Sequence, residues 1–261
     1  VQKRQPEVDA PEVNPLGSGR PTRHDGHEGM RGDTGPALPD DMELVADLGH
    51  GDFGDVYRVC RQGHDYAVKI LRVAGDRAAL TAARREAALL SCVNHPGLAR
   101  IHEVGEICGH PYLAMDLVDG QLLSELFHSG PLDEPDLLAL GRVVAGTLAA
   151  AHRAGVVHRD INPDNILVTA DRRARLVDFG LAARSTLCSL PEGAVVGTPA
   201  YIAPEQTGML NRPVDGRSDL YSLGVVLFEA AAGAPPFVSD DPSQLLNLHL
   251  LEEPPDLAAR R

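Results

Sequence analysis

Three features that would each define a class of protein are missing from this 261-residue chain. No run of about 18 uninterrupted apolar residues occurs, and no signal-peptide layout, so we expect a cytoplasmic protein with no membrane partner. An excess of positive charge is missing too, since the net charge of −13 argues against nucleic acid or an anionic membrane surface as a partner. The four cysteines lie far apart without a C-x-x-C spacing, which favours reduced thiols over disulfides or zinc.

Lysine is nearly absent as well. Of the 24 lysines and arginines, only Lys3 and Lys69 are lysines. The chain otherwise uses arginine but keeps one lysine in a strand predicted over residues 65–71. This choice indicates that the position requires a compact ammonium group rather than the planar guanidinium of arginine. The alternation of a strand puts Ala67 and Leu71 on the same face as Lys69. An ordinary surface lysine is the alternative, and the composition weighs against it.

Residues 1–41 differ in composition from the rest of the chain. They are rich in Pro, Gly, Asp, Arg and His and have no periodicity, so they cannot bury enough apolar surface to offset the entropy lost on ordering. We therefore predict a disordered tail. His24 and His27 could suggest a metal site, but no further ligands cluster with them, which favours solvated side chains. The remaining length suits one domain of two lobes.

Three polar side chains suited to one chemistry lie between residues 157 and 182. Asp160 can accept a proton from a hydroxyl, and Asn165 and Asp178 offer the oxygen ligands that Mg²⁺ prefers. Apolar β-formers follow Asn165 and precede Asp178, which is typical of a small hairpin. Such a hairpin would hold the base and the metal ligands against each other.

A glycine-rich motif occurs near the start of the folded part. Gly49, Gly51 and Gly54 form G-x-G-x-x-G, which alone is weak evidence because a Rossmann turn uses the same glycines. A Rossmann motif opens a helix, whereas the residues from Val56 onward have the composition of a strand. A strand-turn-strand unit would let backbone N–H groups cover phosphates without obstruction by side chains. We therefore interpret the motif as a phosphate-covering loop.

Taken in chain order, these motifs resemble those of eukaryotic-type serine/threonine protein kinases. The resemblance is carried by His158-Arg159-Asp160, Asn165, Asp178-Phe179-Gly180 and Ala203-Pro204-Glu205. It implies an α+β, two-lobed protein-kinase fold, with the tail (1–41), an N-lobe (42–118) and an incomplete C-lobe (119–261). It also implies transfer of the γ-phosphoryl group of ATP, bound with Mg²⁺ or with Mn²⁺ in its place, to Ser or Thr hydroxyls of a protein substrate in bacterial signalling.

The resemblance also implies a set of site residues. Catalytic roles fall to Asp160, Lys69, Glu86, Asn162 and Thr198, while Asn165 and Asp178 would hold the metal. The nucleotide would contact Leu48, Gly49, Gly51, Gly54, Val56, Ala67, Lys69, Met115, Asp116, Val118 and Leu167. Glu86 lies on the inward side of a helix predicted over 76–92 and would pair with Lys69. An exposed helix carboxylate is the alternative for Glu86.

The segment after Phe179 has the length and flanks of an activation segment. Thr198 and Pro199 belong to a stretch that resembles the serine/threonine-specific version of the family, so we expect Thr198 beside Asp160 as a structural hydroxyl. In the family, Arg159 pairs with a phosphate on this loop. We hypothesise that Glu192 supplies a fixed negative charge instead, because the available phosphoacceptors lie further upstream. These phosphoacceptors are Ser185, Thr186 and Ser189.

Two further expectations concern the hydrophobic helix that begins near Arg217. In the family, the acid at Asp219 anchors the backbone of the catalytic loop. Ser218 or Asp219 would also cap the start of this helix, since both residue types are favoured at that position.

Asn162 departs from the family pattern, because serine/threonine members usually carry a lysine at this position. The amide can donate a hydrogen bond but brings no charge, and charge stabilisation is the main catalytic contribution in phosphoryl transfer. We therefore expect a lower turnover. The departure also supports an alternative function, a non-catalytic nucleotide-binding scaffold in a larger signalling protein.

A second departure concerns the end of the chain. The kinase pattern covers about residues 42–251, and the last helices of the second lobe do not appear, nor does the arginine that usually pairs with Glu205. We therefore expect a C-terminally truncated domain. Residues 161–165 and 201–224 are similar to kinase domains that head bacterial multidomain sensor kinases, which implies covalently linked regulatory domains.

Overall fold

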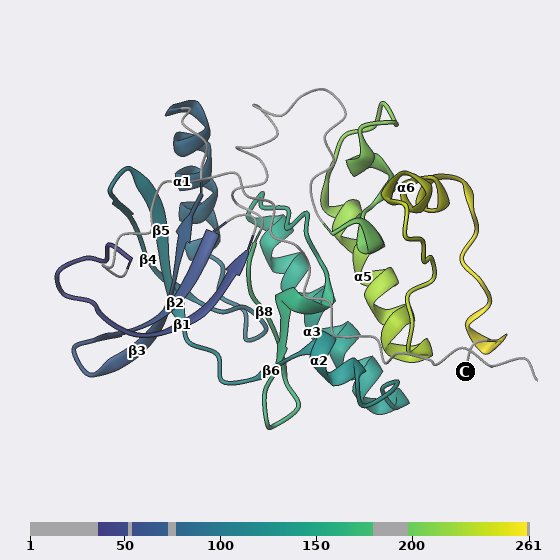
Figure 1. Cartoon of the computed structure of the whole chain (residues 1–261), viewed down its shortest axis with the longest axis horizontal. Coiled ribbons are helices and arrows are strands. Elements are labelled where there is room, and N and C mark those ends of the chain that lie inside the picture. Colours follow the sequence, from purple (N-terminus) through teal and green to yellow (C-terminus); the bar gives the residue numbers. More distant parts are fainter. Residues whose placement is uncertain (1–35, 52–53, 73–76, 180–197, 260–261) are drawn as a thin grey trace, which may run out of the picture. The chain divides into compact units, whose positions relative to one another are not determined.

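The computed structural model describes residues 36–51, 54–72, 77–179 and 198–259 (Figure 1). Several sequence predictions lie outside these ranges and have no structural counterpart here. They are most of the tail with His24 and His27, the glycine at Gly180, the phosphoacceptors Ser185, Thr186 and Ser189, and the charge at Glu192. In the part of the chain that the structure describes, no helix combines the length and the apolar character needed to cross a membrane.

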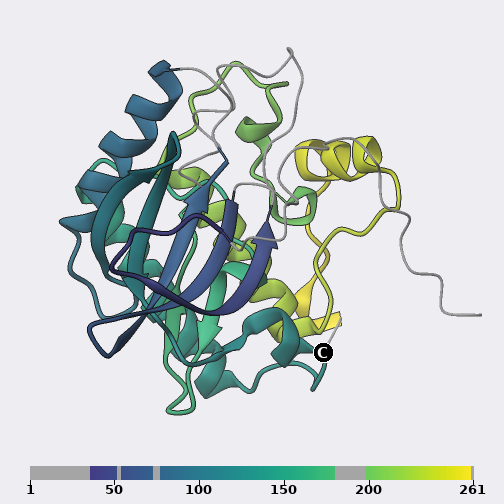
Figure 2. The ribbon, with the colours of Figure 1, turned by 60° about the vertical axis from the view of Figure 1, so that its left-hand side comes forward.

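The first half of the described chain forms a five-stranded antiparallel sheet with one helix, here called the N-lobe. Its strands are β1 (Glu43–Gly51), β2 (Gly54–Arg61), β3 (His64–Leu71), β4 (Ile101–Ile107) and β5 (His110–Asp116), in the order β1-β2-β3-β5-β4. Helix α1 (Arg77–Ser91) packs on β4 and β5 (Figure 2). The turn between β2 and β3 needs Gly63, whose φ of 79° lies in the left-handed region.

The alternation predicted for β3 is confirmed. Ala67 and Leu71 belong to the main hydrophobic cluster, which also holds Leu90 of α1. Val68 points to the opposite face and joins a second cluster with Tyr112. Lys69 lies between Ala67 and Leu71 on the same face, so its side chain is on the α1 side of the sheet.

The second half, here called the C-lobe, is mainly helical. It contains α2 (Leu123–Phe127), α3 (Glu134–Arg153), α5 (Gly216–Ala232) and α6 (Pro242–Leu251), together with a small sheet of β6 (Gln121–Leu122), β7 (Ile166–Val168) and β8 (Ala174–Leu176). Short 3₁₀ turns complete it: η1 (Pro163–Asn165), η2 (Pro199–Tyr201), η3 (Pro204–Thr207) and η4 (Leu257–Ala259). Helices α3 and α5 pack against each other.

Capping residues set the starts of the two long helices. Asp133 caps α3 by accepting a hydrogen bond from the Asp136 backbone N–H. Asp215 caps α5 in the same way through the Arg217 N–H. The prediction that Ser218 or Asp219 caps α5 is therefore wrong, and both side chains are free for other partners.

Backbone hydrogen bonds join the lobes beside the hairpin of β7 and β8. The Leu176 N–H donates to the Gly97 carbonyl at 2.7 Å, and the Ala99 N–H donates to the Leu176 carbonyl at 3.2 Å. The main hydrophobic cluster also runs across this junction, from Leu113 of β5 to Leu148 of α3. The residue that follows β8 in the chain therefore comes close to the strand that carries Lys69.

The main cluster should dominate stability, and α3 offers a matched test. Leu148 is 0% exposed, whereas Leu138 on the same helix is 59% exposed. We expect Leu148→Ala to lower the free energy of unfolding by about 2–5 kcal/mol, because the deletion leaves a cavity. Leu138→Ala should change it by less than about 0.5 kcal/mol. Denaturant titration of both variants measures the difference, and equal losses would contradict this assignment of the core.

Candidate active site

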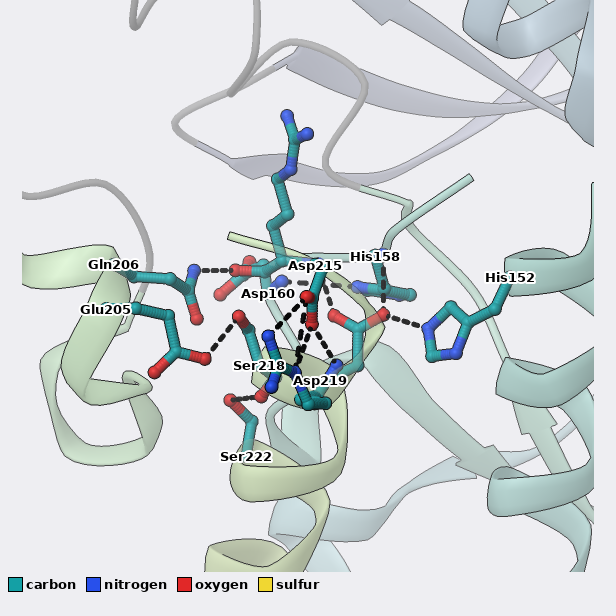
Figure 3. A network of polar contacts seen from close by, with 11 residues as sticks. His152, His158, Asp160, Glu205, Gln206, Asp215, Ser218, Asp219 and Ser222 are labelled. Atoms are coloured by element: carbon teal, nitrogen blue, oxygen red, sulfur yellow. Dashed lines mark hydrogen bonds and ion pairs between the residues drawn. The ribbon is translucent and has the colours of Figure 1, made fainter. Parts of the chain in front are cut away.

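A buried carboxylate on α5 holds the loop that carries Asp160. Asp219 is 0% exposed and accepts hydrogen bonds from the backbone N–H groups of His158 at 2.9 Å and Arg159 at 2.7 Å. His152, in the last turn of α3, reaches the same carboxylate with its Nε2 at 2.6 Å (Figure 3). The prediction that Asp219 anchors the loop backbone is confirmed. The role of His152 was not predicted from the sequence.

The Asp160 carboxylate receives donors from three predicted site residues. Its Oδ1 accepts from Asn162 Nδ2 at 3.0 Å and from the Thr198 N–H at 3.2 Å, with the Thr198 hydroxyl at 3.3 Å. Its Oδ2 accepts from Asn165 Nδ2 at 3.1 Å. These contacts fix the orientation of the carboxylate, and the expected position of Thr198 beside Asp160 is found.

Asn162 is also the N-cap of the short turn η1. Its Oδ1 accepts from the backbone N–H groups of Asp164 at 2.9 Å and Asn165 at 3.2 Å. Its Nδ2 donates to Thr198 Oγ1 at 3.0 Å as well as to Asp160. The side chain is buried, and both of its polar atoms have partners.

The small hairpin brings Asn165 and Asp178 together as predicted. Ile166 pairs with Leu176, and the Val177 N–H donates to the Asn165 carbonyl at 2.9 Å, so Asp178 follows directly. Asn165 donates its Nδ2 to Asp160, and its Oδ1 takes part in no hydrogen bond among the described residues. A carboxylate and an amide oxygen form the kind of donor set that Mg²⁺ prefers, so the two side chains fit a magnesium site.

Lys69 pairs with Asp178. The Lys69 Nζ lies 2.7 Å from Asp178 Oδ1, and the lysine side chain is only 6% exposed. Glu86 is also buried, on the side of α1 that faces the core, as predicted. No ion pair between Lys69 and Glu86 occurs among the described residues, so the structure presents a different pairing from the expected one.

Two residues of the site have a backbone conformation that is unusual for side chains other than glycine. The φ angles of Arg159 and Asp178 are 68° and 56°. Such conformations cost of order 1–3 kcal/mol and persist only where surrounding contacts impose them. The hydrogen bonds of Asp219 impose the first, and the ion pair with Lys69 holds the side chain of the second.

Strand register gathers the predicted nucleotide-contacting residues of the N-lobe. Val56 pairs with Lys69 across β2 and β3, and Ala67 pairs with Met115 across β3 and β5. Gly54 is required sterically, because a Cβ there would lie 2.3 Å from the Ile70 carbonyl oxygen. Leu48 on β1 is 48% exposed, as expected for an apolar side chain at the open face of a binding site.

The remaining predicted contacts lie around the connection between the lobes. Met115 and Lys69 line a small cavity of about 20 Å³, together with Leu176 and Phe179. The Asp116 side chain turns toward β4, where it accepts from His102 Nε2 at 2.6 Å, and the Asp116 backbone N–H donates to the Arg100 carbonyl at 2.9 Å. Gly49 and Gly51 lie on β1, Val118 follows β5, and Leu167 lies on β7.

His158 is a neutral structural group beneath the site. Burial is the main cause that lowers the pKa of His158. Its Nδ1 accepts from the Asp160 N–H at 3.3 Å, and its Nε2 lies 3.2 Å from the Val177 carbonyl oxygen, which can only accept. The proton is therefore on Nε2. The ring packs against Phe179 with centroids 4.4 Å apart, so His158 joins the two halves of the site.

Residues after Thr198 attach to the same frame (Figure 3). Gln206 Nε2 donates to the Arg159 carbonyl at 2.7 Å, and Ser218 Oγ donates to Glu205 at 2.5 Å. Tyr201 donates to Glu229 at 2.6 Å, and burial is the main cause that raises the pKa of Glu229. Glu205 thus has a hydroxyl partner in this chain, where the family pattern predicts an arginine.

Comparison with known proteins agrees with this geometry. Residues 42–255 match the family described as protein kinase domain. The chain belongs to that family. The crystal structure of the PknI kinase domain from Mycobacterium tuberculosis is similar, with a TM-score of 0.66 and 31% identity, covering 86% of this chain and 83% of that one. The two-lobed α+β kinase fold implied by the motifs is therefore confirmed.

Curated relatives are serine/threonine protein kinases. PknL of Mycobacterium tuberculosis (strain CDC 1551 / Oshkosh) is 40% identical over 219 residues, which cover 81% of this chain and 54% of PknL. PknB of Mycobacterium leprae (strain TN) is 37% identical over 233 residues, covering 85% of this chain and 37% of PknB. The chain thus spans about half or less of the length of these relatives.

The buried histidine of α6 generates a pH prediction. Burial is the main cause that lowers the pKa of His249, which lies 2.9 Å from the Tyr221 hydroxyl and packs against Phe237. Below the unfolded-state pKa of about 6.5, the unfolded chain takes up a proton that the folded chain resists, so stability falls as pH falls. We expect His249→Gln to remove up to about 1.4 kcal/mol per pH unit from this slope in that window.

Denaturant titrations of both proteins between pH 7 and pH 5 measure the slope, whatever the stability of the variant at pH 7. An identical slope in the two proteins would contradict the prediction.

Proposed function

We propose that the chain is an ATP-dependent serine/threonine protein kinase. The observation that carries this proposal is the Asp160 carboxylate, which is held by donors from Asn162, Asn165 and Thr198. A carboxylate held in this way can accept the proton of a hydroxyl as that hydroxyl attacks the γ-phosphorus. The 36–40% identity to named serine/threonine kinases of bacteria supports the same activity.

Each remaining residue of the site has a proposed role. Asn165 and Asp178 would hold Mg²⁺, with Mn²⁺ as a substitute, and the bound ion would neutralise charge on the phosphates. Lys69 would bind the α- and β-phosphates. The three glycines of the loop and the apolar residues around it would cover the nucleotide. These nucleotide-contacting residues are Leu48, Gly49, Gly51, Gly54, Val56, Ala67, Met115, Asp116, Val118 and Leu167.

The pairing of Lys69 is proposed to differ between the free and the loaded protein. In the free protein the Lys69 ammonium occupies Asp178 Oδ1, where it would compete with a metal ion for the carboxylate. Glu86 is buried on α1, on the side of the helix that faces the core, and would become the partner of Lys69 when Asp178 turns to the metal. Lys69 would then keep a charged partner within the N-lobe.

We also propose that the kinase acts in bacterial signalling together with covalently linked regulatory domains. The support is the likeness of residues 161–165 and 201–224 to kinase domains of multidomain sensor kinases. The substrate class, a protein carrying Ser or Thr, is supported by Thr198, which lies beside Asp160 as in the serine/threonine-specific members.

Transfer of labelled γ-phosphate tests the activity directly. We would incubate the 261-residue chain with Mg·ATP and a generic Ser/Thr protein substrate, and compare Asp160→Asn with the wild type. Loss of the proton acceptor should lower the rate by about 10²–10⁴-fold. Asp171→Asn is a matched control, because Asp171 is an exposed aspartate beyond β7, away from the site, and its loss should leave transfer unchanged.

Calorimetric titration with Mg·ATP supplies the second measurement. Transfer that is lost in Asp160→Asn but retained in Asp171→Asn would support the kinase. Binding of Mg·ATP without any transfer by the wild-type chain would contradict it and favour a non-catalytic nucleotide-binding module.

A further inference from the structure

Asn162 contributes more to the site than an uncharged replacement for lysine would. Its two polar atoms make contacts in two directions: Oδ1 accepts from two backbone N–H groups, and Nδ2 donates to Asp160 and to Thr198. Only an oxygen can accept from the two N–H groups, so the orientation of the amide is fixed. The side chain is only 3% exposed, and water cannot easily replace these partners.

The accepting half of the amide controls the turn that carries the metal ligand. Asn162 has an extended backbone, with φ −150° and ψ 168°, and Pro163 follows as the first residue of η1. Proline at this position has no N–H, so the first free donors of the turn belong to Asp164 and Asn165, and both point at Asn162 Oδ1. This cap holds the backbone of Asn165, and Asn165 Nδ2 in turn donates to the Asp160 carbonyl at 2.7 Å.

The donating half of the amide controls the base and its neighbour. Nδ2 lies 3.0 Å from Asp160 Oδ1 and 3.0 Å from Thr198 Oγ1, so one group links the catalytic loop to the residue that opens η2. Asp160 and Thr198 are 38 positions apart in the sequence, and their mutual contacts are longer, at 3.2 and 3.3 Å. Asn162 therefore makes the shorter contact to each of them.

We propose that Asn162 is a positioning residue that sets the base, the Thr198 hydroxyl and the turn of the metal ligand through one amide group. A lysine has three donors and no acceptor, so it cannot cap η1. At residue 162 the side chain thus serves to position its neighbours rather than to supply a positive charge. We therefore expect Asn162→Lys to lower activity instead of raising it. This inference rests on the proposed kinase function.

Two variants separate the halves of the amide. Asn162→Asp keeps an oxygen toward the two backbone N–H groups but presents a carboxylate oxygen, instead of a donor, to Asp160. Asn162→Ala removes both halves. We expect kcat to fall about 10–100-fold in each, because small misplacements of reacting groups have effects of that size. The Mg²⁺ concentration for half-maximal rate should rise several-fold in Asn162→Ala and in Asn162→Lys, and stay near wild type in Asn162→Asp.

The pH profile supplies a readout that a merely structural role would not move. In Asn162→Asp, two carboxylates lie within hydrogen-bonding distance of each other and retain a shared proton more readily than one carboxylate alone. The acid limb of the kcat/KM profile should therefore move to higher pH in Asn162→Asp, and by less in Asn162→Ala, which only removes one hydrogen-bond donor from the Asp160 carboxylate.

Asp133→Ala is the matched control for loss of a cap. Asp133 caps α3 as Asn162 caps η1, but it is exposed and lies outside the site. We expect Asp133→Ala to lower the melting temperature without changing kcat, the Mg²⁺ requirement or the pH profile. Melting curves of all variants establish that each is folded at the assay temperature.

Three results would overturn the proposal. The first is a kcat for Asn162→Lys equal to or above that of the wild type, since charge would then outweigh position. The second is a Mg²⁺ requirement that rises as much in Asn162→Asp as in Asn162→Ala. The third is wild-type kinetics in Asn162→Ala. If Asn162→Lys does not fold, the comparison of the Asp and Ala variants decides alone. Absence of phosphoryl transfer by the wild-type chain would instead refute the proposed function itself.

Discussion

The site depends on one buried carboxylate. Asp219 has no exposed surface, and its two oxygens accept from the backbone of His158, from the backbone of Arg159 and from His152. An ionised group without partners is very costly at such depth, so the three donors and the carboxylate require one another. Because Asp219 belongs to α5 and His152 to α3, the loop that carries Asp160 is fastened to the two longest helices among the described residues of the C-lobe.

A series of hydrogen bonds connects the loop held by Asp219 to the rest of the site. The loop fastened at Arg159 presents Asp160, Asp160 is oriented by Asn162 and Asn165, and Asn165 meets the strand that leads to Asp178. These contacts of Asp160 lie within residues 160–165, whereas the Val177 N–H reaches the Asn165 carbonyl from the other strand of the hairpin. Thr198 joins this frame through its contact with Asn162, and Gln206 adds a hydrogen bond to the Arg159 carbonyl.

Much of the fold could be predicted from the sequence, because the local signals agree with the tertiary structure. The alternation of β3 placed Lys69 correctly, and the apolar pattern of the long α3 and α5 helices is the pattern of the core they form. The start of α5 was predicted wrongly, since Asp215, Ser218 and Asp219 are all good capping residues and only the tertiary structure decides among them. Helix α2 and strand β6 are too short to give a periodic signal.

The sequence predicted which residues form the site, but not every contact between them. The choice of partner for Lys69 depends on how α1 and the hairpin approach each other, which no local pattern encodes. The capping role of Asn162 could have been inferred, because asparagine before proline is typical of a helix N-cap. The residue had been compared only with the lysine it replaces. His152 gave no signal beyond its place near the end of a helix.

The ion pair of Lys69 with Asp178 has a consequence for how two ligands would bind. An anion that neutralises Lys69 releases the carboxylate of Asp178, and a cation that takes up this carboxylate releases the ammonium. Each ligand thus removes the free-energy cost of breaking the ion pair that the other ligand would otherwise meet. Thermodynamic linkage requires each ligand to raise the affinity for the other by the same factor. In the free site Lys69 and Asp178 act as counterions to each other, and the two bound ligands would replace this pairing.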